Sequence, residues 1–403
     1  MQYLYIRKST SKHMKVCMLT TSFPSHKGHH QSPFILSLAE ALARNKVKVD
    51  VVCPFYHKGK DKEETINGVR VHRFQYLYPA TLQGLHKGGG LPHNLKRSHL
   101  SKIELMPYLF VYFLKAIKYA RNADIIHAQW SLSGLVGVYL KKMFKKPLII
   151  STRGVAVQKA SKSKWMKPIL KSVLKNADYI TPNNIHHLES IKKLGIPKSK
   201  IISIPNGVDT KLYKPRAKTS QKKILFVGWL IERKGVLDLV NAFTKIHEQH
   251  PQAILQLIGS GSLKSKIKTT IKKAGLQSKV KMIDSVSPEK VADYMSKADL
   301  FILPSLTEGR PNVIYEAMLS QLPIIATNIP GTNELIQNKK NGILVPTKNP
   351  NAIAKAAIEL LNNNTKATKL AKTARKNILT SKVSWDDSAK KFIKLYKEAT
   401  CAE

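Results

Sequence analysis

Apolar and polar positions along this chain follow a strand, loop, helix and strand order that occurs twice. The first unit consists of an apolar run at residues 15–20, a loop rich in proline, glycine and histidine at 21–31, a helical spacing of apolar positions at 33–44 and an alternating run at 47–53. The second unit repeats this order at residues 223–228, 229–235, 236–248 and 253–258. The pattern predicts that a second parallel sheet starts near residue 223.

Further apolar runs predict strands, with helices between them. Strands are expected at residues 124–127, 147–152, 179–180, 201–204, 280–283, 299–303, 323–327 and 343–345, and helices at 131–144, 165–176 and 386–399. Alternating strands and helices favour doubly wound α/β sheets, which bind ligands at the carboxyl ends of their strands. Residues 206–222 are polar and contain glycine and proline between the two strand series. We therefore predict a linker at 206–222 between domains at 14–205 and 223–384.

Charge narrows the possible partners without choosing one. The 403 residues include 68 Lys and Arg against 25 Asp and Glu, a net charge of +43. Such a charge suits nucleic acid, an anionic membrane surface or acidic substrates, and a lysine-rich proteome also produces it. A basic nucleic-acid-binding protein is one interpretation, but no zinc finger, helix-turn-helix or aromatic-rich ribonucleoprotein motif supports specific nucleic-acid binding. The three widely spaced cysteines, Cys17, Cys53 and Cys401, predict neither a disulfide framework nor a structural zinc site.

Hydropathy predicts no transmembrane segment. A span needs roughly 18 consecutive apolar residues, and the best candidate, Leu105–Leu114, is shorter and is followed by Lys115 and Lys118. The first 13 residues carry cations but no apolar signal-peptide core. The expectation is a cytoplasmic protein with Met14 as the candidate start.

The most specific motif is the segment Pro304–Met318, which reads PSLTEGRPNVIYEAM. A strand ends where this segment begins, and a helix is expected from Asn312, just after a proline suited to helix entry. The N–H groups of a helix N-terminus stabilise an anion by about 0.3 to 1 kcal/mol, or about 2 when partly buried, so a diphosphate suits this position. Glu308 precedes the terminus and Glu316 lies one turn into the helix. Two interpretations stay open for the carboxylates: both belong to a site, or Glu308 favours the helix dipole and Glu316 is a surface charge.

A second motif lies in the loop Gly228–Gly235, at the end of the first strand of the second domain. It contains Arg233 and Lys234, and arginine clamps phosphate oxygens in pairs while lysine acts as a point charge. In a chain this basic, the same pair also fits two solvated surface charges.

Taken in order, these motifs resemble the retaining nucleotide-sugar glycosyltransferases of family four, which have the GT-B fold. In the second half the resemblance rests on Phe226–Gly228, Arg233–Gly235, Gly259–Gly261, Glu308 to Glu316, Leu322–Ala326, Gly331–Glu334 and Asn341–Val345. In the first half it rests on Ser22–Pro24, Asp124–Ala128 and Ile204–Asp209. The resemblance covers nearly the whole chain from Met14. It implies an α/β protein with two Rossmann-like domains facing a central cleft, the first for the acceptor and the second for the donor, and a helix at 385–403 that crosses back to the first domain.

The resemblance also implies roles for individual residues. Glu308 would approach the donor sugar hydroxyls, Lys234 and Arg233 would hold the diphosphate, and Glu316 would bind the nucleotide ribose. The other implied positions are Gly28, Gly309, Asn312, Val313, Ile314 and Val286 for the donor, and Arg153 and His127 on the acceptor or phosphate side.

Some positions depart from the family pattern. Trp229 stands where many members have arginine, and Arg153 stands where many have histidine. An arginine stays protonated and cannot act as a base near neutral pH. A catalytically impaired, glycosyltransferase-like binding protein is therefore the alternative to an enzyme. The three histidines around Gly28, which are His26, His29 and His30, fit acceptor contact or solvation better than a metal site.

The expected reaction transfers a sugar from a UDP- or GDP-sugar to a hydroxyl of a saccharide or lipid-linked acceptor, with retention and without metal or cofactor. Cell-envelope polysaccharide or glycolipid synthesis is the expected context. Residues 159–175 contain six lysines and no acid, with Trp165, Ile169, Val173 and Leu174 on one helical stripe. This pattern suits a helix on the anionic inner face of a membrane, and it equally suits a helix packed on the sheet.

Overall fold

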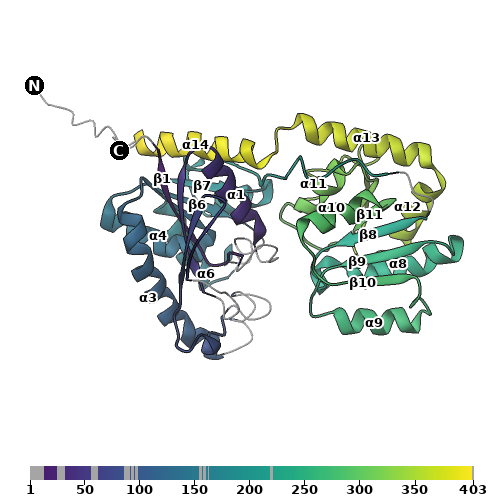
Figure 1. Cartoon of the computed structure of the whole chain (residues 1–403), viewed down its shortest axis with the longest axis horizontal. Helices are drawn as coiled ribbons and strands as arrows, with labels where there is room; N and C mark the ends of the chain where they lie inside the picture. The colour runs from purple at the N-terminus through teal and green to yellow at the C-terminus, as the bar shows by residue number, and fades with distance from the viewer. Residues whose placement is uncertain are drawn as a thin grey trace, which may run out of the picture.

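The computed structural model describes residues 13–24, 32–55, 62–85, 91, 95, 99–153, 157, 160–161, 163–217 and 221–401, without the side chains of residues 185–187. These residues form two α/β domains, each built on its own sheet (Figure 1). Two parallel sheets with helices between their strands occur where the sequence predicts them, and the structure adds elements that were not predicted.

The first domain has a seven-stranded sheet within its described residues, in the order β3-β4-β2-β1-β5-β6-β7. Its strands are β1 (Lys15–Thr20), β2 (Lys48–Pro54), β3 (Glu63–Ile66), β4 (Val69–Phe74), β5 (Ile125–Gln129), β6 (Leu148–Thr152) and β7 (Tyr179–Pro182). All neighbours are parallel except β3 and β4, which form an antiparallel hairpin. Its helices are α1 (Pro33–Arg44), α3 (His99–Arg121), α4 (Trp130–Phe144), α6 (Met166–Lys175) and α7 (Ile185–Lys192), with short 3₁₀ turns at Ala80–Leu82 and Lys198–Lys200.

The second domain has a six-stranded, all-parallel sheet in its described part, in the order β10-β9-β8-β11-β12-β13. Its strands are β8 (Lys223–Val227), β9 (Ile254–Ile258), β10 (Val280–Ile283), β11 (Leu300–Leu303), β12 (Ile324–Thr327) and β13 (Ile343–Val345). Its helices are α8 (Val236–Gln249), α9 (Lys264–Lys273), α10 (Pro288–Ser296), α11 (Asn312–Leu319), α12 (Pro350–Asn362) and α13 (Asn364–Thr380), with a 3₁₀ turn at Glu232–Lys234.

Aspartates fix the amino ends of strands in both domains. Asp124, just before β5, accepts a hydrogen bond from the Lys15 amide at the start of β1, at 2.8 Å. Asp299, just before β11, accepts one from the Lys223 amide at the start of β8, at 2.9 Å. These bonds satisfy backbone donors that the ladders leave open at the sheet edge. The central strand pair of each domain is therefore held in register by the same device.

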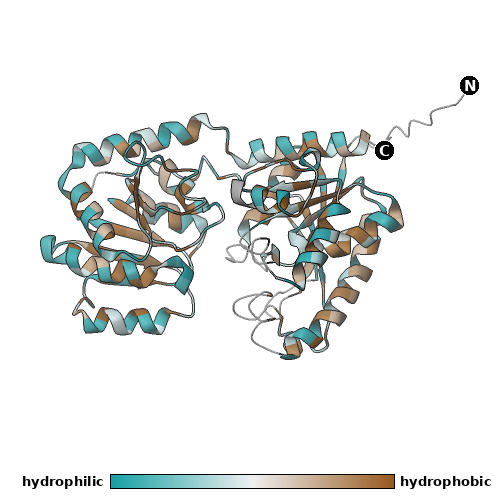
Figure 2. Ribbon diagram, turned by 180° about the vertical axis from the view of Figure 1, so that it is seen from behind, coloured by the Kyte–Doolittle hydropathy of each residue, from teal (hydrophilic) through white to brown (hydrophobic). Residues whose placement is uncertain are grey.

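The cores lie on both faces of each sheet, as the nearly continuous apolar strands require. Figure 2 shows the strands as brown bands between helices that are teal on many outer positions. The last helix, α14 (Trp385–Cys401), follows the second domain in the chain but packs on α1 of the first, where Phe392, Leu395 and Tyr396 are buried (Figure 1). The two domains are thus connected both by the linker and by α14.

The structure differs from the sequence prediction in one hairpin, several helices and one strand. Helices α7, α9, α10, α12 and α13 were not predicted. The β3–β4 hairpin, which turns at Asn67 and Gly68, and the long helix α3 were not predicted. The strand expected at 201–204 is reduced to a segment beside β7, where only the amides of Ile202 and Ile204 donate to β7 carbonyls, at 3.0 and 3.2 Å. As the hydropathy predicted, none of the described helices is both long and apolar enough to cross a membrane.

Candidate active site

Strand order places the two sequence motifs of the second domain side by side. Strands β8 and β11 are neighbours in the sheet, so the loops that leave their carboxyl ends, 228–235 and 304–311, meet at one edge. The Leu306 amide donates to the Arg233 carbonyl at 2.8 Å, which ties the loops together. This edge carries Lys234, Arg233 and Glu308.

Glu308 is the centre of this cluster. Lys234 Nζ donates to Glu308 Oε1, and the Ser305 hydroxyl donates to the same oxygen at 2.7 Å. The Arg233 guanidinium lies 3.6 Å from Glu308 Oε2. The side chains of Lys234 and Glu308 are only 11% and 7% exposed, whereas that of Arg233 is 40% exposed. The structure therefore brings together the three residues that the resemblance implied in catalysis.

The charges of the cluster keep Glu308 ionised despite its burial. Burial alone would raise the pKa of this carboxyl, but Lys234, Ser305 and Arg233 outweigh burial and lower it below its ordinary value. The result is a buried carboxylate beside two cations, one of which faces solvent. A bound diphosphate could take the outward-facing charge without displacing the buried pair.

Two glycines allow the loops to approach this closely. Gly235 has φ +62°, and a β-carbon there would lie 2.0 Å from the Pro304 carbonyl oxygen. Gly331 has φ +93°, and a β-carbon there would lie 2.2 Å from the Gly309 carbonyl oxygen. Both positions combine a left-handed backbone with no space for a side chain. The glycines thus hold the loop containing Glu308 from both sides.

Helix α11 begins at this edge and presents its N-terminus there. The helix ladder does not use the first N–H groups of a helix, which here belong to Asn312 and Val313. The Ile314 amide, however, donates to the Pro311 carbonyl at 3.1 Å, and the Ile314 side chain is fully buried. The amides of Asn312 and Val313 are therefore the more accessible donors, and the role of the Ile314 backbone in a phosphate cradle stays a prediction.

Glu316, on the second turn of α11, is partly buried and hydrogen-bonded to the Tyr213 hydroxyl. Burial raises the pKa of Glu316 to about 7, although the Tyr213 hydrogen bond opposes this rise. Tyr213 belongs to the linker and is itself buried. The interpretation of Glu316 as a solvated surface charge is therefore wrong.

Arg153 connects the first domain to this edge. It follows β6 and is buried, and its Nε donates to Gln129 Oε1 at 2.9 Å while a terminal nitrogen donates to Asn206 Oδ1. Asn206 in turn donates to Asn312 Oδ1 at 3.4 Å, at the start of α11. Burial lowers the pKa of Arg153 to about 10, so it stays charged at neutral pH. No described carboxylate forms an ion pair with this cation.

His127 lies in the first sheet next to Gln129, which is also the partner of Arg153. Its side chain is fully buried, with Nδ1 2.7 Å from the Tyr396 hydroxyl and Nε2 2.7 Å from the Ser151 hydroxyl. Burial, with the charge of Arg153 nearby, lowers the pKa of His127 to about 3. These contacts join α14 to the first sheet, and the placement of His127 on the acceptor or phosphate side stays a prediction.

The remaining predicted positions lie in loops at the carboxyl ends of the second sheet's strands or outside the residues that the structure describes. Gly309 lies in the loop next to Glu308, and Val286 follows the carboxyl end of β10 and packs partly on the second core. Trp229, one of the family departures, is 41% exposed. Gly28 and its neighbouring histidines lie outside the described residues. In the part of the chain that is described, no three His, Cys, Asp or Glu side chains are grouped as metal ligands.

Three residues in or beside the site were not predicted from the sequence. Ser305 and Tyr213 hold the two carboxylates, and buried Nε of Arg310 has no hydrogen-bond partner in the described structure. Arg310 also stacks on Tyr315, with its guanidinium carbon 5.5 Å from the ring centre. Ser305 and Arg310 lie within the Pro304–Met318 motif, so a role for polar residues of that segment could have been anticipated. Tyr213 gave no local signal.

Comparisons with known proteins agree with this geometry. The profile of "Glycosyltransferase Family 4" matches residues 31–212, and that of "Glycosyl transferases group 1" matches residues 209–377. An uncharacterized glycosyltransferase of Methanocaldococcus jannaschii is 27% identical over 96% of this chain and 98% of its own length. A UDP-Gal:alpha-D-GlcNAc-diphosphoundecaprenol alpha-1,3-galactosyltransferase of Escherichia coli is 27% identical over 62% of this chain and 68% of its own.

Solved structures show the fold. Sucrose-phosphate synthase from Thermosynechococcus elongatus superposes with a TM-score of 0.80 at 22% identity, over 97% of this chain and 100% of that one. Anabaena HepE, in complex with UDP and glucose, superposes with a TM-score of 0.74 at 17% identity, over 96% of this chain and 100% of that one. The two Rossmann-like domains therefore define a GT-B fold. The chain belongs to the group 1 glycosyltransferases.

Proposed function

We propose that this protein transfers a sugar from a nucleoside diphosphate sugar to an acceptor hydroxyl, with retention at the anomeric carbon and without a metal ion. The observation that carries the proposal is the cluster of Lys234, Arg233 and the α11 N-terminus around buried Glu308. Arg153 adds a cation, on the side of the first domain, that pairs with none of the described carboxylates. Such an arrangement suits a diphosphate, whose charge it would neutralise.

The donor in this proposal is a UDP- or GDP-sugar. Glu316 would accept hydrogen bonds from the nucleotide ribose, and Glu308 would bind hydroxyls of the sugar. Support comes from HepE, whose solved complex contains UDP and glucose, and from the Escherichia coli relative, whose name specifies UDP-Gal.

In the proposed reaction, the bond between the anomeric carbon and the diphosphate oxygen breaks. The acceptor oxygen forms its bond on the same face of that carbon, and its proton passes to the leaving diphosphate. The protein then contributes position and charge rather than a nucleophile. Removing one preorganised group of this kind costs about 100- to 1,000-fold in rate. In this proposal, Lys234 and Arg233 are the groups nearest the negative charge that develops on the leaving diphosphate.

The proposed acceptor is a lipid-linked or saccharide hydroxyl of cell-envelope polysaccharide or glycolipid synthesis. The name of the Escherichia coli relative includes a diphosphoundecaprenol acceptor, which supports a lipid-linked substrate. The proposal includes a cytoplasmic protein attached to the inner face of the cell membrane.

A transfer assay tests the proposal. Purified protein is incubated with UDP- and GDP-sugars and with undecaprenyl-diphosphate-linked or free saccharide acceptors, and the anomeric configuration of the product is read by NMR. We expect a product with the donor configuration, formed equally well with excess EDTA and lost in Lys234→Ala. Lys297→Ala, at an exposed ion pair in the same domain, is the matched control. An inverted product, or loss of activity with EDTA that metal restores, contradicts the mechanism; nucleotide binding without turnover would favour the catalytically impaired alternative.

A further inference from the structure

Exposed apolar side chains gather on one side of the first domain. Of the fourteen large apolar side chains that are strongly exposed in the described structure, ten lie on α3, on α4 and at the start of α6. These ten, the apolar surface, are Leu100, Ile103, Met106, Phe110, Leu114, Tyr139, Met143, Trp165, Met166 and Ile169. Scattered exposed residues need no explanation, but a gathered set of this size marks an interaction site.

Helix α3 provides the longest part of this surface. Its exposed apolar side chains recur at helical spacing from Leu100 to Leu114, are 49% to 72% exposed, and cover about 21 Å of the helix at 1.5 Å per residue. The opposite side of α3 is also apolar, since Tyr108, Tyr112 and Ala116 are fully buried on the sheet. Accordingly, α3 is brown along much of its length in Figure 2. Because the inner side of α3 already packs on the core, the fold does not account for the apolar residues on its outer side, and such a patch is typical of an interaction site.

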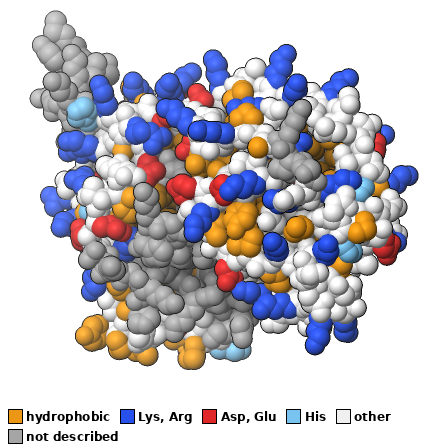
Figure 3. Space-filling model, turned by 45° about the vertical axis from the view of Figure 1, so that its right-hand side comes forward, with side chains coloured by type: hydrophobic (Ala, Val, Ile, Leu, Met, Phe, Trp, Pro, Cys, Tyr) orange, Lys and Arg blue, Asp and Glu red, His pale blue; other side chains and the backbone are white. Residues whose placement is uncertain are grey.

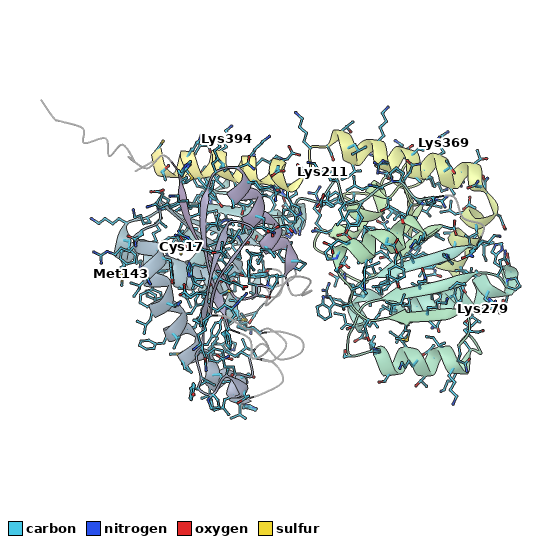
Figure 4. The ribbon with its side chains drawn as sticks, in the orientation of Figure 1. Cys17, Met143, Lys211, Lys279, Lys369 and Lys394 are labelled. Atoms are coloured by element: carbon cyan, nitrogen blue, oxygen red, sulfur yellow. The ribbon has the colours of Figure 1, made fainter. Side chains whose placement is uncertain are left out.

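The three helices turn this surface to one side of the molecule. Helices α3 and α4 pack on the same face of the first sheet, and α6 packs beside α4. Phe113 of α3 and Tyr139 of α4 are in edge contact, with ring centres 6.4 Å apart. Met143 lies at the edge of the first domain that points away from the second domain (Figure 4). The surface is therefore separate from the Glu308 cluster.

Helix α6 contains most of the segment 159–175, for which the sequence left two interpretations open, a helix on a membrane surface and a helix packed on the sheet. Its stripe divides: Leu170, Val173 and Leu174 are buried on the core, whereas Trp165 and Ile169 are 87% and 59% exposed. Packing on the sheet is therefore confirmed for the buried residues, and membrane contact stays a prediction for the exposed ones. The exposed residues belong to its first turn, which follows the segment after Arg153 at the carboxyl edge of the sheet.

The charged residues around the apolar surface are mostly cations, which favours an anionic partner. Helix α3 carries four cations, α4 carries two and α6 carries three, whereas the one acid of the three helices is Glu104. Glu104 turns inward and accepts hydrogen bonds from the Gly84 amide at 2.8 Å and the Tyr76 hydroxyl at 3.1 Å. The exposed stripe of α3 ends in Lys118 and Arg121. The excess of cations is not confined to these helices: on the face of the molecule shown in Figure 3, Lys and Arg side chains outnumber Asp and Glu side chains.

We propose that the apolar surface docks on an anionic lipid bilayer, with its apolar side chains among the acyl chains and its cations at the headgroups. Apolar insertion together with anionic-lipid attraction is what such a surface can satisfy in a bilayer. A second copy of this chain would bring the same cations and a net charge of +43 against them. This inference extends the membrane attachment in the proposed function.

Vesicle sedimentation tests this proposal on the full-length chain. Vesicles are made of phosphatidylcholine alone or with about one third phosphatidylglycerol, at low and high salt. We expect binding only to the anionic vesicles, weakened by salt, since each basic residue near such a surface contributes about fivefold in affinity. Ile103→Glu/Phe110→Glu should lower the affinity at least tenfold. Leu379→Glu, at an exposed apolar residue of α13 in the other domain, should leave it within twofold of wild type.

Several outcomes would overturn the proposal. These are equal binding to both vesicle types, no binding to either, or wild-type binding by the double variant. A dimer in solution that the double variant dissociates would assign the surface to a second copy instead. Calorimetric binding of UDP and GDP by the same proteins separates this inference from the proposed function: intact vesicle binding without any nucleotide binding would refute the transferase alone.

Discussion

Replacement of Lys234 by methionine should destabilise the second domain, because it leaves the Glu308 carboxylate buried without its nearest cation. The two side chains are 11% and 7% exposed, and breaking a buried ion pair from one side costs about 3 to 5 kcal/mol. Ser305 still donates to Glu308 at 2.7 Å and Arg233 remains 3.6 Å away. We therefore expect the lower limit, about 3 kcal/mol, which lowers Tm by about 6 to 12 °C for a domain of this size.

The pH dependence of this loss follows from the sign of the pKa shift. The pKa of Glu308 is below its ordinary value in the folded protein, so the carboxylate contributes stability above about pH 4.5 that disappears as the pH falls through the lowered pKa. The difference between wild type and Lys234→Met should accordingly be largest near neutral pH and fade in acid. Glu308→Gln and the double variant complete a mutant cycle, in which we expect a coupling of at least about 1 kcal/mol.

Thermal and denaturant unfolding, followed across pH, measure these effects. The matched control is Lys297→Met, which breaks the ion pair with Asp293 on α10, where both side chains are more than half exposed. Exposed pairs contribute about 0 to 1 kcal/mol, so this variant should unfold close to wild type. If Lys234→Met unfolds like Lys297→Met, or if its deficit persists undiminished at acid pH, the assignment of a buried, ionised pair is refuted.

Four further predictions follow from the same contacts. Affinity for a nucleoside diphosphate sugar should rise between pH 6 and 8, because the pKa of Glu316 is about 7 and the ionised carboxylate accepts ribose hydrogen bonds more strongly; Glu316→Gln should flatten this rise in calorimetric titrations. Ser305→Ala should cost about 1.5 to 3 kcal/mol in denaturant unfolding and raise the pKa of Glu308, since it removes a donor to a charged group; an unchanged midpoint would argue against that bond. Tyr396→Phe should cost about 1 to 3 kcal/mol in thermal unfolding by leaving the buried His127 Nδ1 unpaired, and a wild-type Tm would contradict the role given to this contact. Excess EDTA should leave initial transfer rates unchanged, and a metal-reversible loss would show that an ion is needed.

Much of the fold was predictable because strands buried on both faces leave continuous apolar runs in the sequence. The hairpin β3–β4 was missed although Asn67-Gly68 is a strong turn signal, since its strands contain charged residues such as Glu63 and Arg70. Helix α3 was missed for the opposite reason. Apolar residues on both its buried and its exposed sides conceal the helical period that a one-sided helix displays.

Some contacts of the candidate site were also predictable from the sequence, and others were not. Lys234 and Glu308 were predictable as neighbours, because adjacent parallel strands bring their following loops to one edge. The buried contact of His127 could not be predicted, because its partner Tyr396 is 269 positions away. Tyr213 was missed for the same reason, since only folding brings the linker to Glu316. Contacts between residues so distant in the chain leave no local pattern.

Titration calorimetry of the purified chain with UDP, GDP, ADP and their sugars most directly tests the central claim, that the Lys234 and Glu308 edge binds a nucleoside diphosphate sugar. We predict binding of a UDP- or GDP-sugar that is lost in Lys234→Ala and Glu316→Ala and retained in Lys297→Ala. A folded wild-type protein that binds none of these nucleotides, or two site variants that bind them as tightly as wild type, would contradict the claim.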